Sequence, residues 1–145
     1  MAHTVVLVED DPRIRERLAA LITANANLKL LAIAGNFVEG RTALKTQTPD
    51  VLLLDLGLPD GDGADLIPLA LRANVRVIVM SVFNNGARLD AALKAGADGC
   101  LFKDSSPRAI GHAVAALFAE SPIHGIPGDA PRGEMAAHRS RGRDV

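Results

Sequence analysis

Aromatic residues are nearly missing from this 145-residue sequence, which has no tryptophan, no tyrosine and only four phenylalanines. Apolar residues nevertheless make up 48% of the chain, so the core must be aliphatic, built from leucine, valine, isoleucine and alanine. A chain of this length fits one domain that can bury an ordinary core.

The sequence also has little cysteine and a net charge close to zero. The single cysteine, Cys100, excludes an internal disulfide and a cysteine-based zinc site. A formal net charge of −1 gives no reason to expect nucleic-acid binding by the whole chain. No apolar run is long enough to cross a membrane, and the first expected strand begins too early for a signal peptide to precede it. These absences predict a soluble, cytoplasmic protein with no membrane partner and no direct DNA binding.

Short apolar runs alternate with amphipathic segments along the chain. The runs are expected strands at residues 4–8, 28–34, 51–54, 75–80 and 99–102. The amphipathic segments are expected helices at about residues 12–25, 37–47, 64–73, 84–95 and 107–119. This alternation predicts a five-stranded parallel sheet with helices on both faces, and right-handed crossovers make it a doubly wound, flavodoxin-like (βα)5 fold of the α/β class.

Several residues mark where the expected helices begin and end. Asp11 and Ser106 stand in N-cap positions, and each is followed by a proline at the first helical position. Gly96 is expected to stop the fourth helix, and Pro68 to kink or shorten the third.

The composition changes near the end of the fifth expected helix. We expect residues 1–121 to form one domain and residues 122–145 to form a tail rich in proline, glycine and arginine. Such a tail has too few residues to build a helix-turn-helix unit with its own core, and chain ends of this kind are typically disordered. No DNA-binding domain is expected within this chain.

Asp55 lies at the centre of the most informative stretch, residues 50–63. It follows the unbroken apolar run 51–54, the pattern of a strand buried on both faces, and a loop rich in proline, glycine and aspartate comes directly after it. In open parallel sheets, chemistry takes place just beyond the carboxyl ends of the strands. On this stretch alone, an ordinary turn aspartate is an equally good interpretation.

Polar side chains at the ends of other strands favour the chemical interpretation. Glu9 and Asp10 follow the first strand, Ser81 follows the fourth and Lys103 the fifth. Taken singly, such residues are most often turn, cap or solvent-facing residues. Because the carboxyl ends of parallel strands share one edge, the whole set is expected to converge with Asp55 on one cleft.

Clustered carboxylates repel one another unless a cation joins them, and all-oxygen ligands suit Mg²⁺. Asp10 and Asp55 are expected to bind it directly, Glu9 through a water, and Gly57 through its backbone carbonyl. Asp55 can then attack phosphorus, while the cation and Lys103 offset the charge of the phosphoryl group and Ser81 donates a hydrogen bond to it. Asp11 is expected to act only as a cap, and none of the four histidines shows a ligand spacing.

By four motifs in this order, the chain resembles the receiver domain of two-component response regulators. They are the first strand with its acidic pair, the phosphoacceptor strand and loop, the switch-hydroxyl segment and the lysine segment, at residues 5–12, 50–63, 79–83 and 95–104. The resemblance covers about residues 4–120. It implies that a histidine kinase or phosphotransfer protein phosphorylates Asp55, with Ser81 as the switch hydroxyl and Lys103 as the phosphate-binding lysine. It also implies that Glu9, Asp10 and the Gly57 carbonyl hold Mg²⁺.

Two features qualify this resemblance. Lys103 is followed by Asp104 rather than by proline, which resembles the NarL/FixJ-like branch, whose receivers usually precede a LuxR-type helix-turn-helix domain. Cys100 stands where the family usually has an aromatic residue that swings inward when the hydroxyl moves, and a cysteine cannot act as that lever. The expected output is a surface formed by the last two helices and the strand between them, which binds a partner or a second copy of the chain.

Two other functions remain open at this point. One is a degenerate receiver that binds protein partners without phosphorylation, which Cys100 favours and the complete set of site residues opposes. The other is a phosphatase with an aspartate nucleophile, which commonly has a second carboxylate two residues further on. That position is Gly57, so a phosphoacceptor signalling domain rather than an enzyme is the preferred interpretation.

Overall fold

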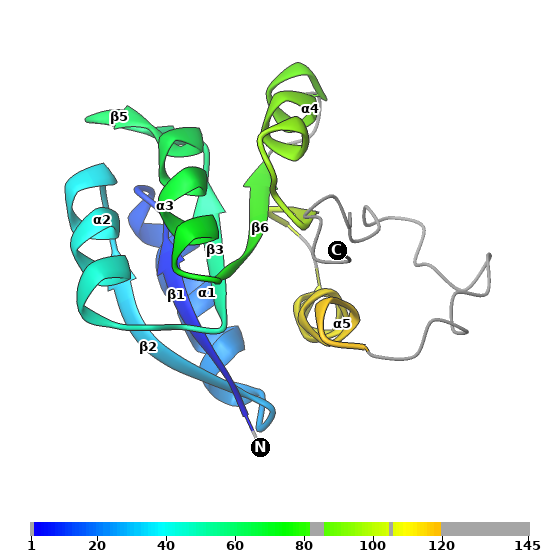
Figure 1. The fold of residues 1–145 in the computed structure, drawn as a ribbon. Helices are drawn as coiled ribbons and strands as arrows, with labels where there is room; N and C mark the ends of the chain where they lie inside the picture. The colour runs from blue at the N-terminus through cyan, green and yellow to red at the C-terminus, as the bar shows by residue number, and fades with distance from the viewer. Residues whose placement is uncertain (1, 82–85, 105, 120–145) are drawn as a thin grey trace.

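A single parallel sheet forms the centre of the molecule. The computed structural model describes residues 2–81, 86–104 and 106–119. The strands of the sheet are β1 (His3–Val8), β2 (Leu28–Ala34), β3 (Val51–Asp55), β6 (Arg76–Ser81) and β7 (Gly99–Phe102), in the order β2-β1-β3-β6-β7 (Figure 1). All four pairings are parallel, which confirms the doubly wound (βα)5 fold.

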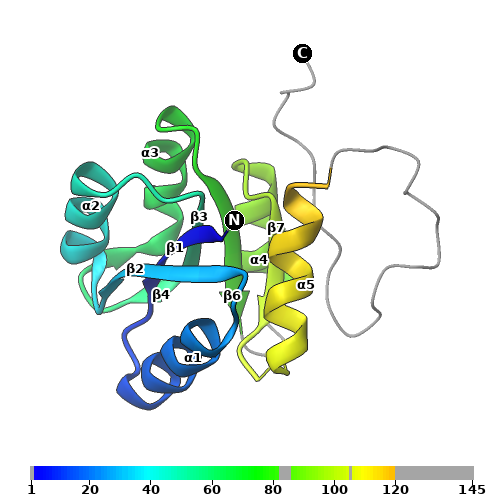
Figure 2. The same ribbon diagram turned by 90° about the horizontal axis from the view of Figure 1, so that it is seen from below.

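Helices cover both faces of this sheet. They are α1 (Pro12–Ala24), α2 (Phe37–Thr46), α3 (Ile67–Arg72), α4 (Gly86–Lys94) and α5 (Pro107–Leu117). Helices α1 and α5 cover one face, and α2, α3 and α4 cover the other (Figure 2). The buried side chains accordingly form two core clusters, one on each face. Among the described residues, no helix combines the length and the apolarity that crossing a membrane requires.

The apolar run of β3 is unbroken because, as expected from the sequence, this strand is buried on both faces. Val51 and Leu53 belong to the core on the α1 and α5 face, whereas Leu52 and Leu54 belong to the core on the opposite face. All four side chains are fully buried. A central parallel strand therefore has no polar face. Its register places its last residue, Asp55, at the carboxyl end of the sheet.

The helix ends agree with the local signals in the sequence. Asp11 accepts hydrogen bonds from the backbone N–H groups of α1, and Ser106 accepts one from α5. Gly96, just beyond α4, has a φ of +118°, a left-handed conformation that favours glycine. Pro68 does shorten its helix: a 3₁₀ turn, η1 (Gly63–Leu66), precedes α3.

A small hairpin after β3 was not predicted from the sequence. It consists of β4 (Gly57–Leu58) and β5 (Gly61–Asp62), which pair antiparallel around a turn at Pro59 and Asp60. The carboxylate of Asp60 accepts hydrogen bonds from the backbone N–H groups of Phe37 and Val38 at 2.6 and 3.2 Å. These bonds tie the hairpin to the start of α2 and lower the pKa of Asp60.

Other boundaries differ by a residue or two. β6 begins at Arg76 and includes Ser81, α4 ends at Lys94, and α5 ends at Leu117. Helix ends commonly differ by this much from any expectation because their last hydrogen bonds are incomplete. The start expected for the fourth helix and the tail at residues 122–145 lie outside the described residues.

Candidate functional site

The carboxyl edge of the sheet gathers the polar residues that the sequence singled out. Asp55 is the last residue of β3, and Ser81 is the last residue of β6. Glu9 and Asp10 follow β1 directly, and Lys103 follows β7 directly. Because β1, β3, β6 and β7 run in the same direction, their ends open onto one site.

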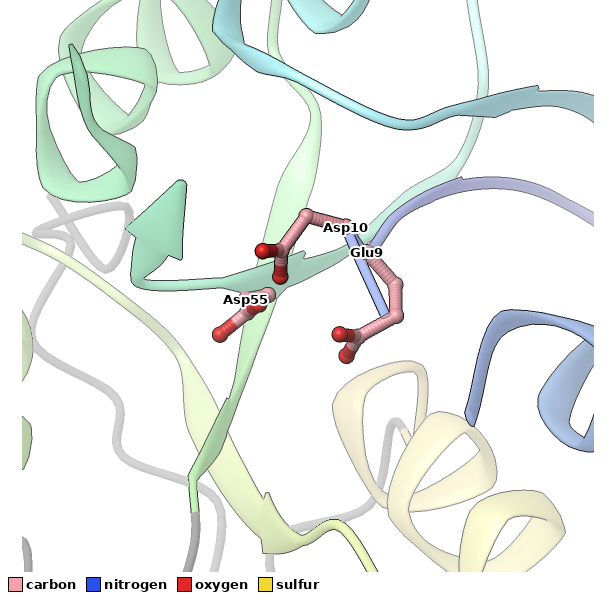
Figure 3. Close-up of side chains that lie close together, drawn as sticks. All are labelled: Glu9, Asp10 and Asp55. Atoms are coloured by element: carbon pink, nitrogen blue, oxygen red, sulfur yellow. The ribbon is translucent and has the colours of Figure 1, made fainter. Parts of the chain in front are cut away.

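Three carboxylates form the centre of this site. Glu9, Asp10 and Asp55 each offer an oxygen, and these oxygens all lie within 4.8 Å of one another. Figure 3 shows the three side chains lying close together, Glu9 and Asp10 just beyond β1 and Asp55 at the end of β3. Glu9 is fully buried, Asp55 is 5% exposed and Asp10 is half-buried, so the cluster is largely shielded from solvent.

Lys103 is the positive charge that balances this cluster. Its Nζ lies 3.1 Å from Oδ1 of Asp55 and 3.2 Å from either carboxylate oxygen of Glu9. Burial alone would lower the pKa of Lys103, but the two carboxylates outweigh burial and raise it. The ammonium therefore stays charged and bridges the ends of β1, β3 and β7.

Asp55 has features of both a turn aspartate and a chemically active carboxylate, the two interpretations that the sequence left open. Its Oδ1 accepts a hydrogen bond from the Gly57 N–H at 3.2 Å, as a turn aspartate does. Its Oδ2 is buried without a hydrogen-bond partner among the described residues. Burial, a hydrogen bond shared with Asp10 and the charge of Glu9 together raise the pKa of Asp55 to about 7, against the opposing effect of Lys103.

Ser81 and Gly57 lie beside the cluster, as expected from their places in the chain. Ser81 is 3% exposed, and its carbonyl accepts a hydrogen bond from the Lys103 N–H at 2.8 Å. Gly57 opens strand β4 two residues after Asp55. The roles of the Ser81 hydroxyl and the Gly57 carbonyl stay predictions.

Two arginines of α1 hold the loops of the site, and sequence reasoning did not find them. Arg15 donates to the backbone carbonyls of Glu9 and Asp10 at 3.1 and 3.4 Å. Arg17 donates to the carbonyl of Lys103 at 2.8 Å, across 86 positions of the chain. The sequence showed only charged residues on the polar side of a helix, a pattern that solvated faces share.

The donor set fits a hard divalent cation. All side-chain donors are carboxylate oxygens, which suit Mg²⁺. Two of their buried atoms, Oε1 of Glu9 and Oδ2 of Asp55, make no hydrogen bond among the described residues, although Oε1 of Glu9 forms an ion pair with Lys103 at 3.2 Å. A buried acceptor such as Oδ2 of Asp55 is costly without a partner, and a bound cation would satisfy it. The chemistry of the cluster therefore agrees with the expected cation site.

Comparison with known proteins agrees with this fold and site. Residues 5–115 match the family of response regulator receiver domains, so the chain belongs to that family. Within it, the chain is a NarL-like receiver domain, and it is part of a two-component signalling system.

Several relatives support this assignment. The nitrate/nitrite response regulator NarL of Escherichia coli K12 is 32% identical over 106 residues, which are 72% of this chain and 49% of NarL. A NarL receiver domain from Mycobacterium tuberculosis superimposes with a TM-score of 0.74 at 29% identity, over 80% of this chain and 95% of that one. A LuxR-family regulator from Aurantimonas gives 0.73 at 26% identity, over 81% and 85%.

The chain spans about half the length of the curated regulators that it matches first. Receiver domains are signalling domains and mostly not enzymes. One relative, a protein-glutamate methylesterase/protein-glutamine glutaminase from Agrobacterium fabrum, is 32% identical over 102 residues, but the match covers only 29% of that protein.

Proposed function

We propose that this protein is a cytoplasmic phosphoacceptor in which Asp55 takes a phosphoryl group from a histidine kinase or phosphotransfer protein. The observation that carries the proposal is the environment of the Asp55 carboxylate. Oδ1 contacts Lys103 at 3.1 Å, whereas Oδ2 is buried beside two further carboxylates and has no hydrogen-bond donor among the described residues. One oxygen is held, and the other is left as a nucleophile or a metal ligand.

In the proposed reaction, a carboxylate oxygen of Asp55 attacks the phosphorus of a phosphohistidine. A phosphorus–oxygen bond forms, the phosphorus–nitrogen bond breaks, and the electron pair of that bond returns to the imidazole nitrogen, which takes up a proton. Lys103 is already directed at Asp55, so its ammonium can offset charge on the transferring oxygens without rearrangement. Ser81 is the expected hydrogen-bond donor to the bound phosphoryl group.

We further propose that Mg²⁺ is required for this transfer. Asp10 and Asp55 would bind it directly, Glu9 through a water, and Gly57 through its carbonyl. When bound, the cation neutralises charge on the phosphoryl oxygens. Arg15 contributes indirectly, because its bonds to the carbonyls of Glu9 and Asp10 fix the loop from which two of the ligands project.

The proposed consequence of transfer is a change of surface. The bound phosphoryl group itself carries a charge of about −1.5 to −2 beside Lys103 and Ser81, in place of the single negative charge of the carboxylate. We propose that α4, β7 and α5, the elements next to these two residues, then favour binding of a partner or a second copy of the chain.

The test is the intact mass of the protein after incubation with acetyl phosphate and Mg²⁺. We expect a gain of one phosphoryl group in the wild type and none in Asp55→Asn, which removes the nucleophile with little change in shape. Adding a chelator should abolish the gain. A gain that persists in Asp55→Asn would place the acceptor elsewhere.

Failure of the wild type to gain mass, with an unchanged circular dichroism spectrum, would favour the degenerate receiver that signals without phosphate. Sustained turnover of a phosphomonoester would instead favour the phosphatase. Both alternatives can be tested with the same purified wild-type protein and the same Asp55→Asn variant.

A further inference from the structure

Cys100 leaves open how the site communicates with α4. Its side chain is buried and belongs to the same core cluster as Leu89 and Ala92, the buried residues of α4. The thiol therefore lies on the face of the sheet that α4 covers, but it is too small to change position as a bulky side chain would. If α4 responds to the site, another group must carry the response.

Arg88 makes a polar connection from α4 to the loop that follows Asp55. Its Nη2 donates to the backbone carbonyl of Leu56 at 3.1 Å and lies 3.6 Å from the carboxylate of Asp62. Its Nη1 lies 3.5 Å from the point where a Cβ on Gly57 would stand, so the guanidinium crosses directly over Gly57. Both α4 and the hairpin lie beyond the carboxyl ends of the strands (Figure 1).

These contacts place Arg88 at both ends of the β4–β5 hairpin. Leu56 immediately precedes the hairpin and follows Asp55, whereas Asp62 is the pairing partner of Gly57. The carbonyl of Leu56 also accepts a hydrogen bond from the Gly63 N–H at 2.8 Å. A movement of Asp55 or Gly57 must therefore change the geometry at Arg88, because the intervening backbone is short and held at both ends.

We propose that Arg88 is a positioning residue that couples α4 to the phosphoacceptor loop. The inference rests on the proposed function of Asp55. The Gly57 N–H bonds to Oδ1 of Asp55, so modification of that carboxylate disturbs the loop, and the Leu56 carbonyl transmits the disturbance to the guanidinium. Coupling of this kind is reciprocal: α4 senses the site, and α4 also restrains the loop.

The test is amide hydrogen exchange of the wild type, Arg88→Ala and Arg88→Lys. Without ligand, Arg88→Ala should speed exchange of the Leu56–Asp62 segment by about fivefold, the factor expected for the loss of one net hydrogen bond. Arg88→Lys should restore part of the protection, because the lysine ammonium keeps the positive charge but lacks the forked N–H donors of the guanidinium. Unchanged exchange in this segment would overturn the proposal.

The second part adds Mg²⁺ with beryllium fluoride, a phosphoryl mimic. In the wild type, exchange of Gly86–Lys94 should change on loading. In Arg88→Ala, the segment around Glu9 and Asp10 should still report loading, while the change in α4 falls by at least half. An α4 response in Arg88→Ala equal to that of the wild type would overturn the proposal.

The matched control is Lys94→Ala, which removes a cation from the same helix. Within the part of the chain that the structure describes, Lys94 forms its ion pair with Asp90 of α4 at 3.5 Å, and both side chains are largely exposed. Loss of this pair should leave exchange of Leu56–Asp62 and the response of α4 unchanged. A Lys94→Ala effect equal to that of Arg88→Ala would mean that helix stability alone is measured and would overturn the coupling. If the wild type does not load, the phosphoacceptor proposal fails, but the ligand-free comparison still decides whether Arg88 restrains the loop.

Discussion

Asp55 shows how one residue can serve both structure and chemistry. The hydrogen bond from the Gly57 N–H makes it a turn residue, and the contact with Lys103 makes it part of a buried charge cluster. A turn requires only one of its oxygens. The second oxygen, Oδ2, is buried without a hydrogen-bond donor among the described residues, beside the carboxylates of Glu9 and Asp10.

Burial is expected to make the thiol of Cys100 unreactive in the folded protein. It is 1% exposed, and burial raises the pKa of its thiol to about 12. Because the thiolate is the reactive form, we expect negligible reaction with a thiol-specific reagent at pH 8 in the native protein and rapid reaction in denaturant. The rate of absorbance change with a chromogenic disulfide reagent measures both.

A control for this prediction moves the thiol to the surface. Val38 is 49% exposed, so Val38→Cys in a Cys100→Ala background should react at the rate of a free thiol without denaturant. Native Cys100 reacting as fast as this surface thiol would contradict the burial that the structure gives it. It would also remove the basis for treating Cys100 as a small residue of the core on the α4 face of the sheet.

At the scale of elements, the segment from β3 to α3 is tied to its surroundings at several points. Asp60 ties it to α2, Arg88 ties it to α4, and the Gly63 N–H ties it back to the carbonyl of Leu56. A Cβ on Gly63 would stand 2.8 Å from the Cα of Leu56 and closer still to the carbonyl oxygen of Asp55. Glycine is required there by space alone, since backbone atoms cannot yield as a flexible side chain would.

Gly63→Ala should therefore destabilise the protein and distort the site. We expect the free energy of unfolding to fall by about 2 kcal/mol or more, as measured by urea denaturation, because the added methyl forces backbone shifts. Phosphoryl gain from acetyl phosphate should fall as well, because the displaced backbone carries Asp55. Gly86→Ala is the matched control, since nothing lies within 4 Å of its added Cβ. Equal stability of the two variants would contradict the close contact at Gly63.

At the scale of the whole molecule, the sheet could be predicted because its signals are local. Each central strand must be apolar on both faces, so β3 appears in the sequence as an unbroken apolar run ended by Asp55. The caps at Asp11 and Ser106 also act within a few residues. The site residues followed from the fold, because parallel strands bring their carboxyl ends together.

What could not be predicted depends on contacts between distant parts of the chain. The hairpin at Gly57–Asp62 is held by Phe37 of α2 and by Arg88 of α4, and neither contact leaves a pattern in the sequence. Arg17 supports Lys103 across the whole domain in the same way. Long, flexible, charged side chains have many solvated positions available, so only the assembled structure determines which backbone carbonyl each one reaches.

The charge cluster also affects the stability of the whole molecule. An isolated Asp side chain titrates near 3.8, but in the folded protein the pKa of Asp55 rises to about 7. Between these values the unfolded chain has released a proton that the folded chain still holds. Unfolding is therefore increasingly favoured as the pH rises through this window, and above about pH 7 the contribution of Asp55 becomes constant.

Asp55→Asn should remove this dependence. In chelator, we expect the variant to match the wild type near pH 4 and to exceed its free energy of unfolding by about 2 kcal/mol at pH 8, a difference that urea denaturation at several pH values measures. Asp60→Asn is the control of opposite sign: the pKa of Asp60 is lowered, so its contribution is present above pH 4 and is lost as the pH falls further. That variant should be less stable than the wild type at neutral pH and equal to it in strong acid. An Asp55→Asn protein that loses stability as the pH rises from 4 to 8 just as the wild type does would show that Asp55 is ionised throughout, with Lys103 outweighing burial and the neighbouring carboxylates.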